Sequence, residues 1–277
     1  MATSLLRSIA RPLVLSALVV QVNDASAQQC PFSEPFTYGD STLLRHPEKD
    51  AYVFAIKHVK IDADGAPNAY HPDDIHLNCE TGTGFKGLDC PANGGYGTSW
   101  WRSALVPDPA NDSKPYVQPS PSEFAGYFVS QTSLTDPAKA AIDPARYVDA
   151  RTVPYLVFPR NFQAMQGTGF IGDIGYAINT SNGKTSPFIV ADTGPSKATL
   201  GEMSIALAKA LGGADPNPRT GTGLPTGKIL VLVFRRSFAH PKWPLSSMEI
   251  DATANKHLTA LGGKQQLLAC ADRLKPK

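Results

Sequence analysis

The stretch FIVADTGPSKATLGEMSIALA, residues 188–208, decides the fold because it joins a strand pattern to a helix pattern. Residues 188–191 are aromatic, β-branched or small, which predicts a buried β-strand. Apolar residues then recur at helical spacing from Leu200 to Leu211, and the following Gly212-Gly213 supplies a left-handed C-terminus, so we expect a helix over about 200–211. The pattern places Asp192 at the end of the strand and Glu202 in the first turn of the helix.

Further runs of strand type surround this stretch. They cover residues 52–61, 124–130, 153–158, 170–178 and 229–234, and a second helical region is expected from about residue 246. The segment 107–121 contains five prolines, so it cannot be a central strand, and we expect it to border a cleft. We predict a mainly β, α+β fold with few helices, forming a single domain over residues 28–277. This domain is expected to be β-barrel-like, with the double-psi type as one option, or a strongly twisted β-sheet.

The first 27 residues have the pattern of a cleavable secretory signal peptide. Arg7 and Arg11 precede an apolar run at 13–20, and the small residues Ala25 and Ala27 fit cleavage after Ala27. The run is shorter than the roughly 20 residues that a membrane-spanning helix needs. We therefore predict a secreted or periplasmic protein without a membrane anchor.

The near-neutral charge balance argues against nucleic acid as a partner. A formal net charge of +2 is far from the basic excess that nucleic-acid binding requires. We therefore predict no nucleic-acid partner. Separately, we predict that the protein needs no cofactor and is a monomer.

The four cysteines allow three disulfide pairings. Cys79 and Cys90 flank a glycine-rich segment, so we prefer a bridge between them and a second bridge joining Cys30 to Cys270. An alternative reading makes His71 and His76, with Cys79 and Cys90, a zinc site. Its spacing matches no familiar cluster and an oxidising compartment favours disulfides, so we predict no metal.

Two glycine patterns resemble nucleotide-binding loops. Gly167 to Gly172 satisfies the dinucleotide fingerprint, but the residues after it read as a strand and not as a helix. The segment 223–228 resembles a phosphate-binding loop, but it is one residue short and also leads into a strand. We predict turns at both places.

Carboxylates supply the candidate chemistry. Asp192 and Glu202 form a pair of the kind that glycoside hydrolysis needs, since one group must protonate the leaving oxygen while the other activates water. Each has an alternative role: Asp192 can cap a turn, and Thr199-x-x-Glu202 matches a capping box. The triplet Asp192-Thr-Gly also matches aspartic proteases, which however need two such aspartates. Asp62 and Asp64 follow a strand and either form a structural turn or point into a cleft.

The same stretch resembles the family 75 chitosanases. An Asp-Thr pair after a strand, followed by Gly-Glu-x-Ser-Ile-x-Leu-Ala, is similar to the family's pattern. Intermittent similarity extends from about residue 52 to residue 234 and includes the segments around Asp62, Gln131 and 147–158. The resemblance implies that Asp192 and Glu202 are the catalytic carboxylates. The residues between them depart from the family's pattern, so other glycans, including bacterial wall polymers, remain open as substrates.

These patterns predict an exported, inverting endo-hydrolase of chitosan or a related amino-sugar polysaccharide, without cofactor. If the helix begins near Leu200, its N-terminus favours ionised Glu202 as the base and leaves Asp192 as the acid. A non-catalytic glycan-binding or structural protein is the alternative. The candidate substrate-binding residues are aromatic or polar side chains that could stack on sugars or line an acidic cleft: Asp62, Asp64, Asp73, Asp74, Gln131, Asp173, Tyr96, Trp100 and Trp101.

Overall fold

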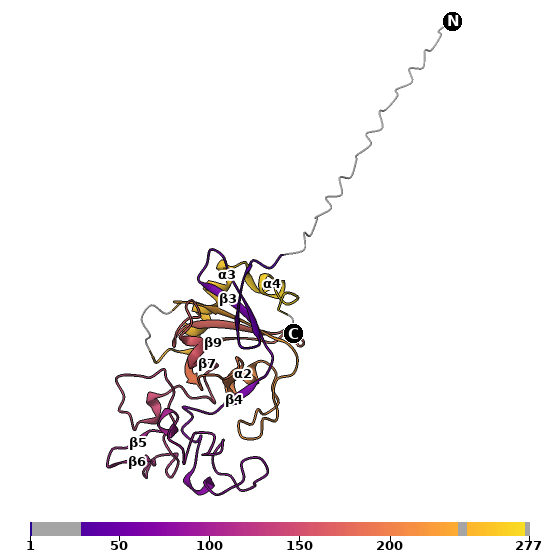
Figure 1. Ribbon diagram of the computed structural model, residues 1–277. Helices are drawn as coiled ribbons and strands as arrows, with labels where there is room; N and C mark the ends of the chain where they lie inside the picture. The colour runs from indigo at the N-terminus through magenta and orange to yellow at the C-terminus, as the bar shows by residue number, and fades with distance from the viewer. Residues whose placement is uncertain (2–28, 238–242, 275–277) are drawn as a thin grey trace.

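The computed structural model describes Met1 and residues 29–237 and 243–274. In these residues one mixed sheet holds nine strands, in the order β1-β2-β3-β11-β8-β9-β7-β10-β4, and β5 pairs with β6 in a small separate hairpin (Figure 1). The strands are β1 (Glu34–Tyr38), β2 (Ser41–Arg45), β3 (Ala51–Ile56), β4 (Lys60–Asp62), β5 (Pro107–Asp108), β6 (Asn111–Pro115), β7 (Tyr155–Pro159), β8 (Ile174–Asn179), β9 (Thr185–Gly194), β10 (Glu202–Ser204) and β11 (Ile229–Phe234). The helices are α1 (Arg160–Gln163), α2 (Ile205–Ala210), α3 (Ser247–Ala260) and α4 (Gly263–Leu268).

The predicted α+β class with a dominant β component is confirmed, but the sheet is not a closed barrel. Its end strands, β1 and β4, do not pair with each other. β1 and β2 form an antiparallel hairpin that extends the sheet beyond β3, so the strand order stays open on that side. Of the two predicted architectures, the structure is therefore an open sheet and not a closed barrel.

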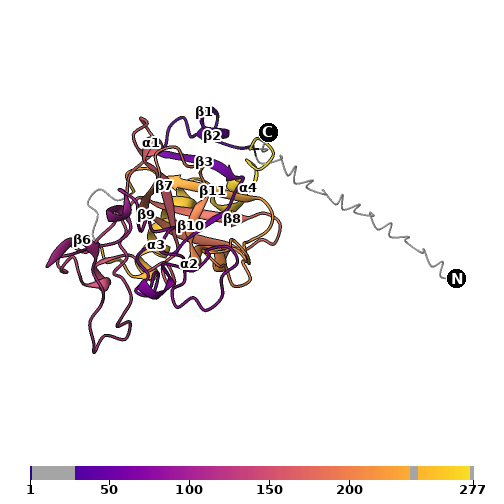
Figure 2. The ribbon, with the colours of Figure 1, turned by 60° about the horizontal axis from the view of Figure 1, so that its bottom comes forward.

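The middle of the sheet consists of strands that are apolar along their whole length. Every residue of β3 and of β11 is buried, and α4 packs against β11. β11 pairs antiparallel with β3 on one side and with β8 on the other. Figure 2 shows these three strands side by side in the middle of the molecule. This rigid centre supports the strands β9, β7, β10 and β4 beyond it.

Two predicted strands differ from the structure. The run 52–61 divides into β3 and β4, since β3 pairs with β2 and β11 whereas β4 pairs with β10. Segment 124–130 forms no named strand: Phe128 and Ser130 make only isolated bridges, to Val117 and Leu105. Both glycine patterns precede strands as predicted, with the turn at 167–172 leading into β8 and the turn at 223–228 leading into β11.

The helix predicted over about 200–211 begins later than expected. Residues 202–204 form β10, and α2 starts at Ile205 with Ser204 as its N-cap, whose Oγ accepts the Leu207 N–H. Gly201 adopts φ +130, which is far from the helical value, so a helix cannot run through this point. Pairing with β4 thus overrides the helical spacing of the apolar residues.

The second helical region is confirmed by α3 and α4. Ser246 and Glu249 form a reciprocal capping box at the start of α3. α3 packs against β8 and β9 on the sheet. In Figure 1, α3 and α4 lie near the top of the molecule, while the loops between β4 and β7 form its lower part.

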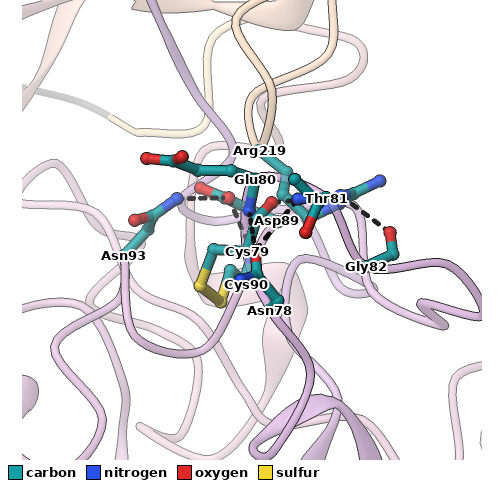
Figure 3. Close-up of a disulfide and its surroundings, with 9 residues drawn as sticks. All are labelled: Asn78, Cys79, Glu80, Thr81, Gly82, Asp89, Cys90, Asn93 and Arg219. Carbon is teal, nitrogen blue, oxygen red and sulfur yellow. Dashed lines mark hydrogen bonds between the residues drawn. A yellow bond between two sulfur atoms is a disulfide. The ribbon is translucent and has the colours of Figure 1, made fainter.

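Both preferred disulfides are present. Cys30 is joined to Cys270, which ties the two ends of the described chain together, and Cys79 is joined to Cys90. Figure 3 shows the second bridge, with the Arg219 guanidinium donating to the carbonyl oxygens of Cys79 and Gly82. Because the two thiols of the alternative zinc set are bonded to each other, the zinc reading is wrong.

Two further observations concern localisation. Within the described residues no helix has both the length and the apolar character to cross a membrane. The predicted signal peptide, residues 1–27, falls outside the described residues except for Met1. The disulfides fit an extracellular protein.

Candidate active site

A cavity of about 970 Å³ lies at one end of the sheet, where β7 and β9 end and β10 begins. Its size is at the upper end of the range of about 300–1,000 Å³ that is usual for ligand pockets. Its walls come from the sheet and from the loops that follow β4 and α2. The lining residues that carry charge are Lys60, Asp62, Asp64, Asp89, Arg102, Arg160, Asp192 and Glu202.

Asp192 faces the cavity because β9 contains a bulge. β9 runs parallel to β7, with Leu156 opposite Val190 and Val157 opposite Asp192, so Ala191 is an extra residue. Strict alternation would put Val190 and Asp192 on the same face. The inserted residue instead gives Asp192 the face of Val157, which lines the cavity.

The Asp192 carboxylate is buried and specifically held. The backbone N–H and the Oγ of Ser133 each donate to its Oδ1 at 2.8 Å. These two bonds come from a segment 59 positions away in the sequence, so Asp192 does not cap a local turn. Burial raises the pKa of Asp192 to about 6, while the hydrogen bonds from Ser133 and from the Thr193 backbone oppose that rise.

Glu202 lies on the next strand but one. β10 is antiparallel to β7 with Met203 opposite Leu156, which puts Glu202 beside Val157, and β10 is parallel to β4 with Glu202 opposite Lys60. The side chains of Asp192, Val157, Glu202 and Lys60 therefore form one row across the same face of the sheet. The glutamate Oε2 lies 3.2 Å from the position that a Cβ on Gly194 would take.

Glu202 is a strand residue, which overturns the capping-box reading and the placement in a first helical turn. The cap of α2 is Ser204, and Glu202 makes no bond to the helix N–H groups. Burial, followed by the charge of Asp192, raises the pKa of Glu202 to about 7, and the neighbouring Lys60 opposes the rise. Glu202 therefore does not lie at a helix N-terminus, and the prediction that such a position makes it the base is not supported.

Asp62 and Asp64 come close to Asp192 although β4 and β9 are three strand spacings apart. One carboxylate oxygen of each of the three residues lies within 4.8 Å of the others. Three spacings of a flat sheet amount to about 14 Å, so the sheet must curl sharply around this cluster. The predicted direction of Asp62 and Asp64, into a cleft, agrees with this position, since both line the cavity.

Hydroxyl groups form hydrogen bonds with the carboxylates of Asp62 and Asp64. The Tyr155 hydroxyl lies 3.1 Å from Asp62 Oδ2 and 2.9 Å from the Asp64 carbonyl oxygen. Tyr70 and Ser130 each donate to Asp64 Oδ1 at 2.9 Å. Burial is the first cause that raises the pKa of Asp62 and of Asp64 well above the ordinary value, and neighbouring carboxylates add to it. These groups keep protons to a higher pH than exposed aspartates.

The same three aspartates are the only group in the described part of the chain whose spacing could hold a metal ion. Oxygen ligands of this kind suit Ca²⁺ or Mg²⁺. Both oxygens of Asp62, Oδ1 of Asp64 and Oδ1 of Asp192 already accept hydrogen bonds from the protein. A cation would thus compete with donors that the fold supplies.

The other predicted substrate-binding residues separate into two groups. Trp100 lines the cavity and is 47% exposed, so its ring is available to a ligand. Trp101 is buried in the core, and Tyr96 stacks on Phe128. Four polar residues also lie outside the cavity lining: Asp73, Asp74, Gln131 and Asp173.

Each of those residues has a structural partner. The Gln131 amide donates to the Arg102 carbonyl oxygen, and Asp173 accepts the Phe170 N–H. Asp73 pairs with Lys86. Fewer acidic residues therefore line the cavity than the sequence predicted.

Several cavity residues were not recognised in the sequence. Asp89, which lines the cavity from the loop that follows β4, is buried, and burial raises its pKa to about 6. Lys60 and Arg160 bring positive charge to the lining. Tyr155 was visible as part of a strand, but no local pattern marks it or Ser133 as partners of the aspartates.

No family model and no curated protein matches the chain.

Proposed function

We propose that the protein is an exported endo-acting glycoside hydrolase that cleaves chitosan or a related amino-sugar polysaccharide with inversion of configuration. The observation that carries the proposal is the row Asp192–Val157–Glu202 on the cavity floor. It holds two carboxyl groups on either side of one small apolar side chain. Both pKa values are raised, to about 6 and about 7, so one group can be ionised while the other retains its proton.

The environments of the two groups favour Glu202 as the acid and Asp192 as the base. Two donors from Ser133 stabilise the ionised form of Asp192, whereas Glu202 accepts no hydrogen bond from the described residues and has the higher pKa. Glu202 then protonates the glycosidic oxygen as the carbon–oxygen bond breaks. Asp192 removes a proton from the water that attacks the anomeric carbon from the opposite face. This reverses the assignment based on a helix N-terminus.

The substrate class rests on three supports. The segment around Asp192 and Glu202 resembles the family 75 chitosanases. The cavity has a volume of about 970 Å³, and Trp100 offers a flat face to a sugar ring. Two disulfides agree with export to a compartment where wall polysaccharides occur.

Variant kinetics test the proposal. We expect Glu202→Gln and Asp192→Asn each to lower the release of reducing ends by about 10²- to 10⁴-fold. Thr199→Ala is the matched control, because Thr199 is exposed and its supposed capping role is absent from the structure. Full activity of Glu202→Gln would refute the catalytic assignment.

Two further measurements define the mechanism. Proton NMR of the first products should show the anomer opposite to that of the substrate bond, and products of retained configuration would refute inversion. Activity should persist in EDTA, because the steps above use only carboxyl groups. Loss of activity that Ca²⁺ or Mg²⁺ restores would instead assign the three-aspartate cluster to a metal.

The alternative is a glycan-binding protein that uses the same cavity without catalysis. It predicts measurable binding of oligosaccharides and no increase in reducing ends for any polymer. It also predicts that Asp192→Asn and Glu202→Gln affect affinity alone.

A further inference from the structure

The cavity contains three positively charged residues together with its carboxyl groups. Lys60, Arg102 and Arg160 all line it, and all three are exposed. Chitosan is polycationic, so these residues would repel it. These three cations, set among the five carboxyl groups of the lining, call for a more specific account of the substrate.

Arg102 is partly engaged by its surroundings. Its guanidinium donates to the Asp112 carbonyl oxygen, lies 3.7 Å from the Asp112 carboxylate and packs over the Trp101 ring. It therefore has a structural role that accounts for its position. Lys60 and Arg160 differ from it in this respect.

The side chains of Lys60 and Arg160 make no hydrogen bond or ion pair with any residue that the structure describes, although both residues take part in backbone hydrogen bonds. Lys60 ends the row that contains Asp192 and Glu202, since it lies opposite Glu202 on β4. Arg160 follows β7 directly, three residues after Val157 and beside the end of β9. Two exposed cations thus flank the row that holds the carboxyl pair.

Two of the five carboxyl groups of the lining, Asp89 and Glu202, lose charge at mildly acidic pH. Asp89 is buried and bonded to Asn93 and to the Cys90 N–H, so it is committed to the loop wall. Burial raises the pKa of Asp89 to about 6 and that of Glu202 to about 7, so both lose charge as the pH falls toward 6.

We propose that the cavity binds an amino-sugar glycan whose sugars carry carboxylate groups, and that Lys60 and Arg160 bind those carboxylates on either side of the bond to be cleaved. The inference rests on the hydrolase function proposed above and specifies its substrate. A guanidinium can bind a carboxylate with two parallel hydrogen bonds, which suits Arg160 to this role.

Binding measurements test the inference independently of catalysis. Glu202→Gln protein is titrated by calorimetry with oligosaccharides of equal length. One alternates N-acetylglucosamine with N-acetylmuramic acid, one alternates N-acetylglucosamine with glucuronic acid, and two controls contain only N-acetylglucosamine or only glucosamine. We expect at least one acidic oligosaccharide to bind about tenfold more tightly than the neutral control. The preferred one identifies whether the carboxylate sits on a lactyl ether or on the sugar ring.

Charge variants on the same background assign the residues. Arg160→Gln and Lys60→Gln should each weaken binding of the acidic oligosaccharide about tenfold and leave the neutral control unchanged. Arg160→Glu should reverse the preference toward glucosamine oligomers. Lys256→Gln removes an exposed cation on α3, away from the cavity, and should change neither affinity.

Two results would overturn the inference. One is tighter binding of the glucosamine oligomer than of both acidic ones, and the other is an acidic preference that survives both charge-removing variants. In either case hydrolysis of chitosan by the wild type would leave the proposed function intact. Failure of the proposed function has a different signature, namely equal inactivity of the wild type and Glu202→Gln on every polymer.

Discussion

Replacing Ser133 with alanine would test the assignment of Asp192 as the base. The variant keeps the backbone N–H bond to Asp192 Oδ1 and removes the Oγ bond of 2.8 Å. A hydrogen bond to a charged group contributes about 1.5–3 kcal/mol, and 1.36 kcal/mol corresponds to one pKa unit. Because Ser133 is exposed and water can replace part of the lost bond, we expect a rise near the lower limit. The pKa of Asp192 should therefore rise from about 6 by about one unit.

The assay is the pH dependence of kcat/KM on an accepted glycan. A base must be ionised to act, so activity should increase with pH through the pKa of Asp192 and decrease through that of Glu202, giving a bell between about 6 and about 7. In Ser133→Ala the acidic limb should move to higher pH by about one unit. Ser133→Thr keeps the hydroxyl and serves as the matched control.

The direction of the shift distinguishes the possible roles. Movement of the alkaline limb with a fixed acidic limb would make Asp192 the acid and Glu202 the base. An unchanged profile in Ser133→Ala would show that the Ser133 bond does not set the titration of the site, and the argument from hydrogen bonding would fail.

Four further outcomes are expected. Glu202→Gln should stabilise the fold by about 1–3 kcal/mol at pH 8 and not at pH 4, because a carboxyl whose folded pKa is raised from 4.5 to about 7 costs stability once it ionises; melting temperatures at both pH values check this. Replacing Cys30 and Cys270 with serine should lower the free energy of unfolding by about 2–4 kcal/mol in urea titrations. Gly194→Ala places a Cβ 3.1 Å from Val157 Cγ1 and 3.2 Å from Glu202 Oε2, so kcat should fall about tenfold, with a near-normal melting temperature. Trp100→Ala should raise KM about threefold to tenfold and leave kcat unchanged, as measured by steady-state kinetics.

The sequence predicted those parts of the fold that depend on local pattern. The run 229–234 is a strand at the predicted bounds, because a short, continuous apolar run rich in β-branched residues is typical of a strand buried on both faces. The helix expected from Leu200 shows the opposite case. Its apolar spacing is real, but residues 202–204 gain hydrogen bonds to β4 that lie far away in sequence. Helical periodicity cannot reveal such a partner.

The candidate site divides in the same way. Asp192, Asp62 and Asp64 could be selected because of their residue type and their position at strand ends, and Glu202 as the partner of Asp192 in the resemblance. All four line one cavity. Asp173 and Gln131 suggested the same role and lie elsewhere. Whether a polar residue at a strand end faces a cavity depends on the strand order, which here brings β4 next to β10 and not next to β3.

The orientation of Asp192 shows where pattern reading reaches its limit. In the segment 188–194 the alternation of a regular strand would turn Asp192 to the face of Val190, which is fully buried. The bulge at Ala191 turns it to the other face, and the Ala191 carbonyl oxygen accepts the Leu134 N–H, next to the Ser133 that bonds Asp192. The residues that aim the carboxylate and the residues that hold it charged therefore belong to one contact between β9 and the loop at 133–134. Any change that straightens β9 would remove the aspartate from the cavity and release its donors together.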